Sequence, residues 1–119
     1  MLVIPTRGRP HNFQRLITAC LETDTQEPAW IRLDEDDATL PQYRELVMPD
    51  NWKITVGPSL PLSEVYNEAY RTMPETEYWG FIADDVVPET QGWDRALIAA
   101  ARRDGMAVPA GGDTTGGTP

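Results

Sequence analysis

Two adjacent carboxylates, Asp84 and Asp85, are the side chains of this sequence best suited to chemistry. They follow an apolar, aromatic run over 78–83, which predicts a buried strand that ends at the two acids. In an open α/β sheet, ligands bind outside the carboxyl ends of the strands. Two acids there offer oxygen ligands to a hard divalent cation, and such a cation commonly holds a phosphate. Because two adjacent carboxylates repel each other unless a cation is bound, we interpret the pair as a ligand site rather than as a purely structural feature.

Two further loops carry charged residues that suit a ligand with phosphate groups. The segment 6–9, Thr-Arg-Gly-Arg, offers forked guanidinium donors to phosphate oxygens, and backbone amides near Gly8 add to them. The segment 34–37, Asp-Glu-Asp-Asp, contains carboxylates that can accept a hydrogen bond from a base imide or a ribose hydroxyl. Each segment also has a structural interpretation, as solvated surface for 6–9 and as an acidic helix start for 34–37.

The pattern of apolar residues predicts the elements that must position these loops. Strands are expected over 2–5, 29–33, 52–56, 78–83 and 106–109, with helices starting near 12, 41, 63 and 93. This alternation predicts an α/β domain with a mainly parallel sheet and helices on both faces. The loops after the first, second and fourth strands then open on one side of the sheet, around a single crevice. We expect the domain to cover 1–109 and the Gly/Thr-rich stretch 110–119 to be a flexible tail.

Composition excludes several classes of protein. The chain has 119 residues, enough for one domain, and a formal net charge of -9, which argues against binding nucleic acid through a basic face. Because Cys20 is the single cysteine, the chain cannot form an internal disulfide. No apolar run approaches the roughly 18 residues of a membrane span. We therefore expect a cytoplasmic protein. No P-loop, nucleophile elbow or GxGxxG pattern supports an ATPase, a hydrolase of that type or a dinucleotide-binding enzyme.

The motifs together resemble those of the family 2 type glycosyltransferases with the GT-A fold, and specifically the half of those enzymes that binds the nucleotide. The closest likeness is to small bacterial and phage-encoded members. The likeness rests on segments in the family's order: 3–10 (VIPTRGRP), 33–37 (LDEDD), Asn67 on the helix before the acidic strand, 81–88 (FIADDVVP) and 92–94 (GWD).

The resemblance implies a Rossmann-like GT-A nucleotide-binding subdomain that takes a UDP-linked sugar with the help of Mn²⁺ or Mg²⁺. The donor-binding positions that it implies are Pro5, Thr6, Arg7, Arg9, Asp34, Asp36, Asn67 and Asp84. It makes Asp85 the chief metal ligand, with Asp84 contacting the ribose or supporting the metal. Ala83 stands where the family's acidic triplet has its first aspartate, which implies weaker metal binding than in a full triplet.

Family members continue into a second half that binds the acceptor and carries the catalytic base, and we expect that base to be absent from this sequence. Three alternatives stay open. The first is a binding module that holds a nucleotide sugar without turnover. The second is a nucleotidyltransferase, for which one glycine between two arginines is a poor phosphate loop. The third is a structural fragment that self-associates through an exposed sheet edge, which would make the protein a homo-oligomer.

Overall fold

The computed structural model describes residues 1–107, and these form an α/β domain with one parallel sheet. The four strands are β1 (Leu2–Pro5), β2 (Ala29–Asp34), β3 (Trp52–Gly57) and β4 (Gly80–Phe81). They lie in the order β3-β2-β1-β4, and every neighbouring pair is parallel. The predicted mainly parallel α/β sheet is therefore confirmed, and the arrangement is consistent with a Rossmann-like fold.

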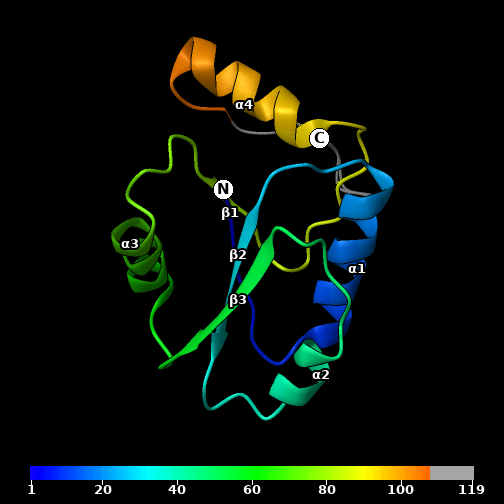
Figure 1. Ribbon diagram of the computed structural model, residues 1–119, viewed down its shortest axis with the longest axis vertical. Coiled ribbons are helices and arrows are strands. Elements are labelled where there is room, and N and C mark those ends of the chain that lie inside the picture. Colours follow the sequence, from blue (N-terminus) through cyan, green and yellow to red (C-terminus); the bar gives the residue numbers. More distant parts are fainter. Residues whose placement is uncertain (108–119) are drawn as a thin grey trace, which may run out of the picture.

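Helices cover both faces of the sheet, as predicted. They are α1 (Pro10–Glu22), α2 (Leu40–Arg44), α3 (Leu62–Thr72) and α4 (Trp93–Asp104). Figure 1 shows α1 and α2 on one face and α3 on the other, with α4 lying across the end at which the strands begin. Because α4 lies at that end, the carboxyl ends of the strands stay free of it.

Two hydrophobic clusters, one on each face, hold these layers together. The cluster beneath α1 and α2 includes Ile4, Phe13 and Tyr43, whereas the cluster beneath α3 includes Val3 and Val65. Since successive side chains of a strand point to opposite faces, neighbouring residues of β1 enter different clusters. A strand covered on both faces reads as a continuous apolar run rather than as an alternating pattern, which is why the central strands were recognisable in the sequence.

The prediction for the fourth strand was wrong in length and in burial. β4 spans only Gly80–Phe81, and Phe81 is 52% exposed. The reason is that β4 lies at the edge of the sheet, where β1 is its partner. The backbone N–H of Gly80 donates to the carbonyl oxygen of Met1, and that of Ile82 donates to Val3, so the pairing is short. Within residues 1–107 no strand pairs with its outer side. Self-association through this edge stays a prediction.

Smaller differences concern the starts of two helices and the segment after α4. α1 starts at Pro10 rather than near 12, because proline suits the first helical turn, where no N–H is needed. α3 starts at Leu62, one residue before the predicted start, and Pro61 is its N-cap residue. Met106 and Ala107 form no strand, and the rest of the predicted strand 106–109 lies outside the described residues, as does the predicted tail 110–119. None of the described helices is long and apolar enough to span a lipid bilayer.

Candidate functional site

The candidate site lies where the order of the strands reverses. From β1 the chain moves outward to β2 and β3, and then returns to place β4 on the other side of β1. The carboxyl ends of β1 and β4 therefore flank a topological switch point, the usual place for a ligand in an open parallel sheet. Thr6, directly after β1, donates a hydrogen bond of 2.7 Å to Oδ2 of Asp84, beyond the end of β4. The structure thus brings the first and fourth of the predicted loops into contact.

The two acids after β4 have different surroundings. Asp84 is only 6% exposed, and its Oδ1 lies 3.5 Å from a guanidinium nitrogen of Arg9 while Thr6 holds its Oδ2. Asp85 is exposed, as is Ala83 on the other side of Asp84. Asp84 is therefore part of the framework of the switch point, whereas Asp85 offers its carboxylate to solvent.

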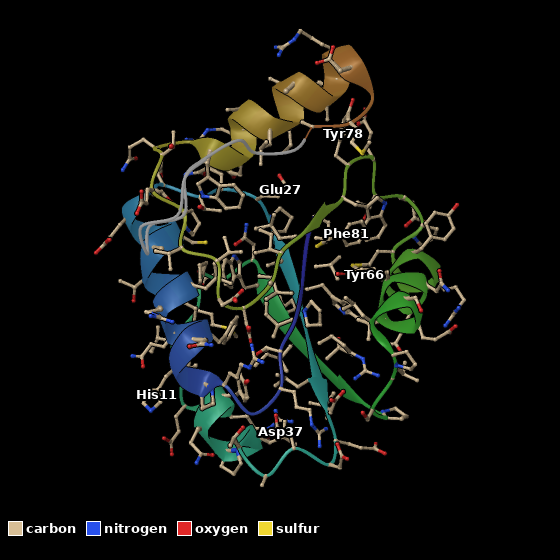
Figure 2. All side chains as sticks on the ribbon, turned by 180° about the vertical axis from the view of Figure 1, so that it is seen from behind. His11, Glu27, Asp37, Tyr66, Tyr78 and Phe81 are labelled. Carbon is tan, nitrogen blue, oxygen red and sulfur yellow. The ribbon has the colours of Figure 1, made fainter. Side chains whose placement is uncertain are left out.

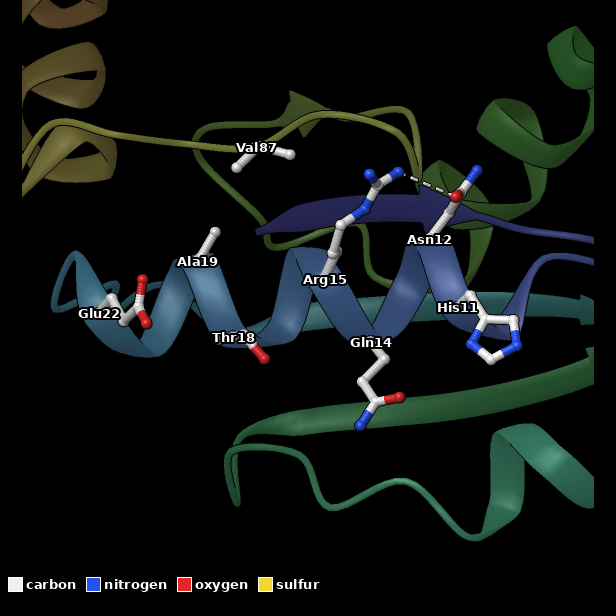
Figure 3. Close-up of a pocket in the computed structure, with 8 residues that line it drawn as sticks. All are labelled: His11, Asn12, Gln14, Arg15, Thr18, Ala19, Glu22 and Val87. Atoms are coloured by element: carbon white, nitrogen blue, oxygen red, sulfur yellow. Dashed lines mark hydrogen bonds between the residues drawn. The ribbon is translucent and has the colours of Figure 1, made fainter.

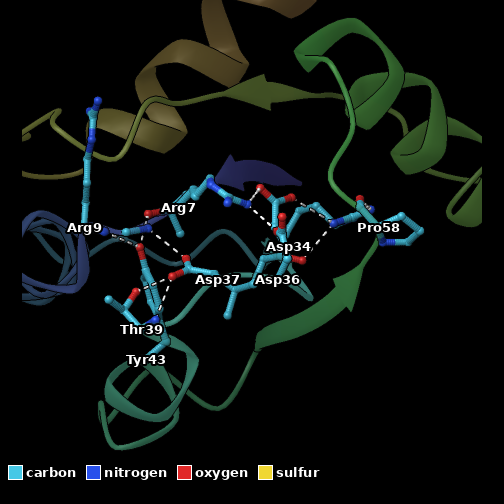
Figure 4. A network of polar contacts seen from close by, with 12 residues as sticks. Arg7, Arg9, Asp34, Asp36, Asp37, Thr39, Tyr43 and Pro58 are labelled. Carbon is cyan, nitrogen blue, oxygen red and sulfur yellow. Dashed lines mark hydrogen bonds and ion pairs between the residues drawn. The ribbon is translucent and has the colours of Figure 1, made fainter.

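The loop 6–9 after β1, the arginine loop, also contacts the acidic loop 34–37 after β2 (Figure 4). Arg7 donates to Oδ2 of Asp34 at 2.9 Å and makes a second ion pair with Asp36. The hydrogen bond from Arg7 is the main reason that the pKa of Asp36 lies below its ordinary value. Because Arg7 and Asp36 are both largely exposed, solvent screens their ion pair and it adds little to stability, so a phosphate can displace Asp36 at little cost.

A buried arginine, Arg32, supports Asp34 from inside the sheet. Arg32 is 1% exposed, and its NH1 lies 3.5 Å from Oδ1 of Asp34. The same guanidinium binds Glu68 of α3 at 2.9 Å through Nε and the carbonyl oxygen of Pro58 at 2.8 Å through NH2. Asp34 is therefore held between an exposed arginine, Arg7, and a buried one. Arg32 gives no functional signal in the sequence, because it stands in the middle of an apolar strand pattern.

The carboxylate of Asp37 links the arginine loop to the start of α2 through hydrogen bonds. Its Oδ2 accepts the backbone N–H of Gly8 at 2.8 Å, and its Oδ1 accepts both the N–H and the hydroxyl of Thr39 at 2.8 and 2.6 Å. Gly8 has a φ of 64°, a left-handed conformation that glycine adopts without strain. The Gly8 amide, expected to contact a phosphate, donates to Asp37 instead.

These bonds make the stability of the protein depend on pH. Burial by itself would raise the pKa of the Asp37 carboxyl, but hydrogen bonds from Thr39 and Gly8 outweigh it and leave the pKa below its usual value of about 3.9. A carboxylate with a lowered pKa stabilises the folded state above its unfolded pKa, and this contribution is lost as the pH falls through the folded pKa.

We therefore expect Asp37→Asn to lower the free energy of unfolding by about 1–2 kcal/mol at neutral pH and by less near pH 3. Urea unfolding at both pH values measures this. Glu35→Gln, an exposed acid of the same loop, is the matched control and should unfold like the wild type. An equal loss for Asp37→Asn at both pH values would contradict the role of the ionised carboxylate.

The donor set suits a cation that arrives with a phosphate ligand. Within residues 1–107 no group of three or more His, Cys, Asp or Glu side chains could hold a metal ion. Mg²⁺ is usually bound by one or two carboxylates, with phosphate oxygens and waters completing its shell. The exposed carboxylate of Asp85 and Oδ1 of Asp84 fit that pattern, whereas they would make a poor site for a metal alone.

Two of the predicted donor-binding residues stand apart from these contacts. Pro5 is the last residue of β1 and pairs in register with Arg32 of β2, so it positions the loop through its backbone. Asn67 is exposed on α3, the helix on the other face of the sheet from α1 and α2. Among the residues that the structure describes, Asn67 makes no hydrogen bond to the other candidates. Its predicted role stays a prediction.

A hollow on the surface lies elsewhere, along the outer side of α1 (Figure 3). It encloses about 670 Å³ and is lined mainly by side chains of α1, with Val87 from the segment after β4. Its polar side chains, including His11 and Arg15, are ordinary helix-surface residues, and Asn12 bonds Arg15 within the same helix. We assign the chemistry to the switch point instead, because the buried Asp84 contacts the loop that carries Arg7 and Arg9 there.

Comparisons with known proteins were made at three levels. Neither the protein-family models, nor the curated proteins, nor the solved structures give a match to this chain. The parallel α/β fold stands on the structure itself. The likeness to GT-A glycosyltransferases stays a hypothesis that rests on the residues and contacts described above.

Proposed function

We propose that the switch point between the ends of β1 and β4 binds a UDP-linked sugar together with Mn²⁺ or Mg²⁺, and that the chain supplies the donor-binding part of a glycosyltransferase. One observation carries this proposal. The loops 6–9, 34–37 and 84–85 meet at the carboxyl edge of the sheet, joined by the bonds of Thr6 to Asp84 and of Arg7 to Asp34. That edge combines exposed cations for a diphosphate with acids for a base and a metal.

Each loop has a separate task in this proposal. The guanidinium of Arg9 is 59% exposed, and its one polar contact among residues 1–107 is the long one to Asp84, so it is available to a phosphate oxygen. Arg7 can exchange the exposed carboxylate of Asp36 for a phosphate. Asp34 keeps the support of the buried Arg32 while its carboxylate accepts a hydrogen bond from the base.

The cation is assigned to Asp85 and to Oδ1 of Asp84. A cation held by these oxygens would supply positive charge against the negative charge that develops on the diphosphate leaving group. Arg7 and Arg9 act on the same oxygens as forked donors. We assign no catalytic base.

The contacts of Gly8 favour a sugar donor site over a nucleotidyltransferase. Nucleotidyl transfer calls for a glycine-rich, basic loop whose amides cradle the triphosphate. Here the loop has one glycine, and its amide already donates to Asp37. The acids and arginines that remain suit a diphosphate held mainly by side chains and a cation.

Release of UDP from a UDP-sugar in the presence of Mn²⁺ tests whether the chain is an enzyme or a binding module. We expect slow release of UDP by the wild type, through transfer or hydrolysis, and none by Asp85→Ala. Replacing Glu89, an exposed acid nearby in the sequence, by glutamine is the matched control and should leave the rate unchanged. Binding of UDP without any release would favour the binding module and contradict catalysis by this chain.

A further inference from the structure

Tyr43 is a buried residue of α2 whose hydroxyl lies between two loops of the candidate site. Its side chain is 0% exposed, and its ring packs against Phe13 at 5.8 Å between centroids. The phenol oxygen lies 2.9 Å from the backbone nitrogen of Arg9 and 2.7 Å from Oγ1 of Thr6. Figure 4 shows Tyr43 rising from α2 toward the arginine loop. The pattern of apolar residues marks Tyr43 only as a core residue and gives no sign of a role for its hydroxyl.

The direction of these hydrogen bonds follows from the groups involved. A backbone N–H only donates, so the phenol oxygen accepts the bond from Arg9. An ionised carboxylate only accepts, so Thr6 gives its proton to Asp84. The remaining bond therefore runs from the Tyr43 hydroxyl to Thr6. The chain of donors runs one way, from the backbone of the arginine loop through Tyr43 and Thr6 to Asp84.

Such a chain is cooperative, because each donated bond polarises the next group. It ends on Oδ2 of Asp84, which leaves Oδ1 as the oxygen directed to Arg9. Burial raises the pKa of the Tyr43 phenol, so the hydroxyl keeps the proton that it donates. The same hydroxyl thus fixes the backbone of one predicted ligand, Arg9, and the orientation of another, Asp84.

We propose that Tyr43 is a positioning residue of the donor site, which sets the Arg9 backbone and the Asp84 carboxylate for a diphosphate and its cation. This inference rests on the proposed function. Packing alone does not need the hydroxyl, since a phenylalanine would keep the ring contact with Phe13. Loss of the hydroxyl leaves the Arg9 amide and the Thr6 oxygen without their partner and frees the Asp84 carboxylate to turn.

Titration with UDP in the presence and absence of Mn²⁺, followed by calorimetry, tests this role in Tyr43→Phe. The quantity of interest is the factor by which Mn²⁺ strengthens UDP binding. We expect this factor to fall about tenfold, roughly the value of one hydrogen bond, with a smaller loss of binding without Mn²⁺ that reflects the displaced Arg9. Tyr66→Phe is the matched control, because Tyr66 packs on Phe81 on the α3 side of the sheet (Figure 2) and should keep the wild-type factor.

Thr6 gives a second route to the same test if Tyr43→Phe does not fold. Thr6→Val removes the middle hydroxyl and should reproduce the loss, whereas Thr6→Ser keeps the hydroxyl and should restore most of the factor. A factor unchanged in Tyr43→Phe and Thr6→Val, or an equal loss with and without Mn²⁺, overturns the positioning role and leaves the proposed function intact. Failure of the wild type to bind UDP under either condition overturns both.

Discussion

Replacing Arg32 with methionine should lower the free energy of unfolding by about 3 kcal/mol, the largest stability effect that we expect from one substitution outside the apolar core. The guanidinium binds Glu68 and Asp34 and donates to the carbonyl oxygens of Leu33 and Pro58. Methionine fills a similar volume but leaves these groups without a donor. The effect lies at the low end of the range for broken buried pairs, because the Glu68 side chain is partly exposed.

The shape of β3 supports this account. Gly57, the last residue of β3, lies against the guanidinium, and a Cβ at that position would come within 2.8 Å of NH2 of Arg32. A larger residue there would displace the charged group from its partners. The arginine and the glycine therefore form one arrangement, which joins β2 and β3 to α3.

Urea unfolding of Arg32→Met, Glu68→Gln and the double variant measures the expected loss. Because Glu68→Gln removes the carboxylate that Arg32→Met leaves unpaired, the double variant should lose less than the sum of the single losses. Lys53→Met is the matched control, since Lys53 is an exposed cation on the neighbouring strand and its loss should cost no more than about 0.5 kcal/mol. A similarly small change in Arg32→Met would show that the network contributes little.

The second large effect that we expect is a difference between substitutions of the two adjacent acids, Asp84 and Asp85. Asp85→Ala should leave the stability of the ligand-free protein within about 0.5 kcal/mol of the wild type, because the side chain is exposed. It should nevertheless weaken Mn²⁺-dependent binding of UDP about a hundredfold, since the accessible carboxylate for the cation is lost. Asp84→Ala should weaken binding as well, and it should also lower stability by about 1–3 kcal/mol, because Thr6 loses its buried acceptor.

Paired measurements of unfolding in urea and of UDP binding in Mn²⁺ distinguish these outcomes. Glu89→Gln again serves as the control, as an exposed acid a few residues further along the chain. Equal effects of Asp84→Ala and Asp85→Ala on stability would contradict the division of roles, and so would wild-type binding of UDP by Asp85→Ala.

The sequence predicts the parallel sheet because its inner strands are covered on both faces and therefore read as apolar runs. The convergence of the loops 6–9 and 34–37 with Asp84 follows from that topology. The burial of 78–83 could not be read in the same way, since an apolar run does not reveal that its strand lies at an edge with one neighbour.

The hydrogen-bond and ion-pair partners of individual polar residues could not be predicted from the sequence. Arg32 interrupts an apolar strand and gives no sign that Glu68, far along the chain, will neutralise it. Tyr43 reads as a core residue because its ring is apolar, and only the fold places its hydroxyl beside Thr6. The occupation of the Gly8 amide by Asp37 also depends on the packing of α2 against the arginine loop.

The switch point at the ends of β1 and β4 is expected to be a site for a nucleoside diphosphate and a divalent cation. Calorimetric titration of the wild-type protein with UDP, with and without Mn²⁺, tests it most directly. We predict saturable binding with one site, at least about a hundredfold tighter with Mn²⁺ than without it. Absence of UDP binding under both conditions, or the same affinity in both, would contradict the claim.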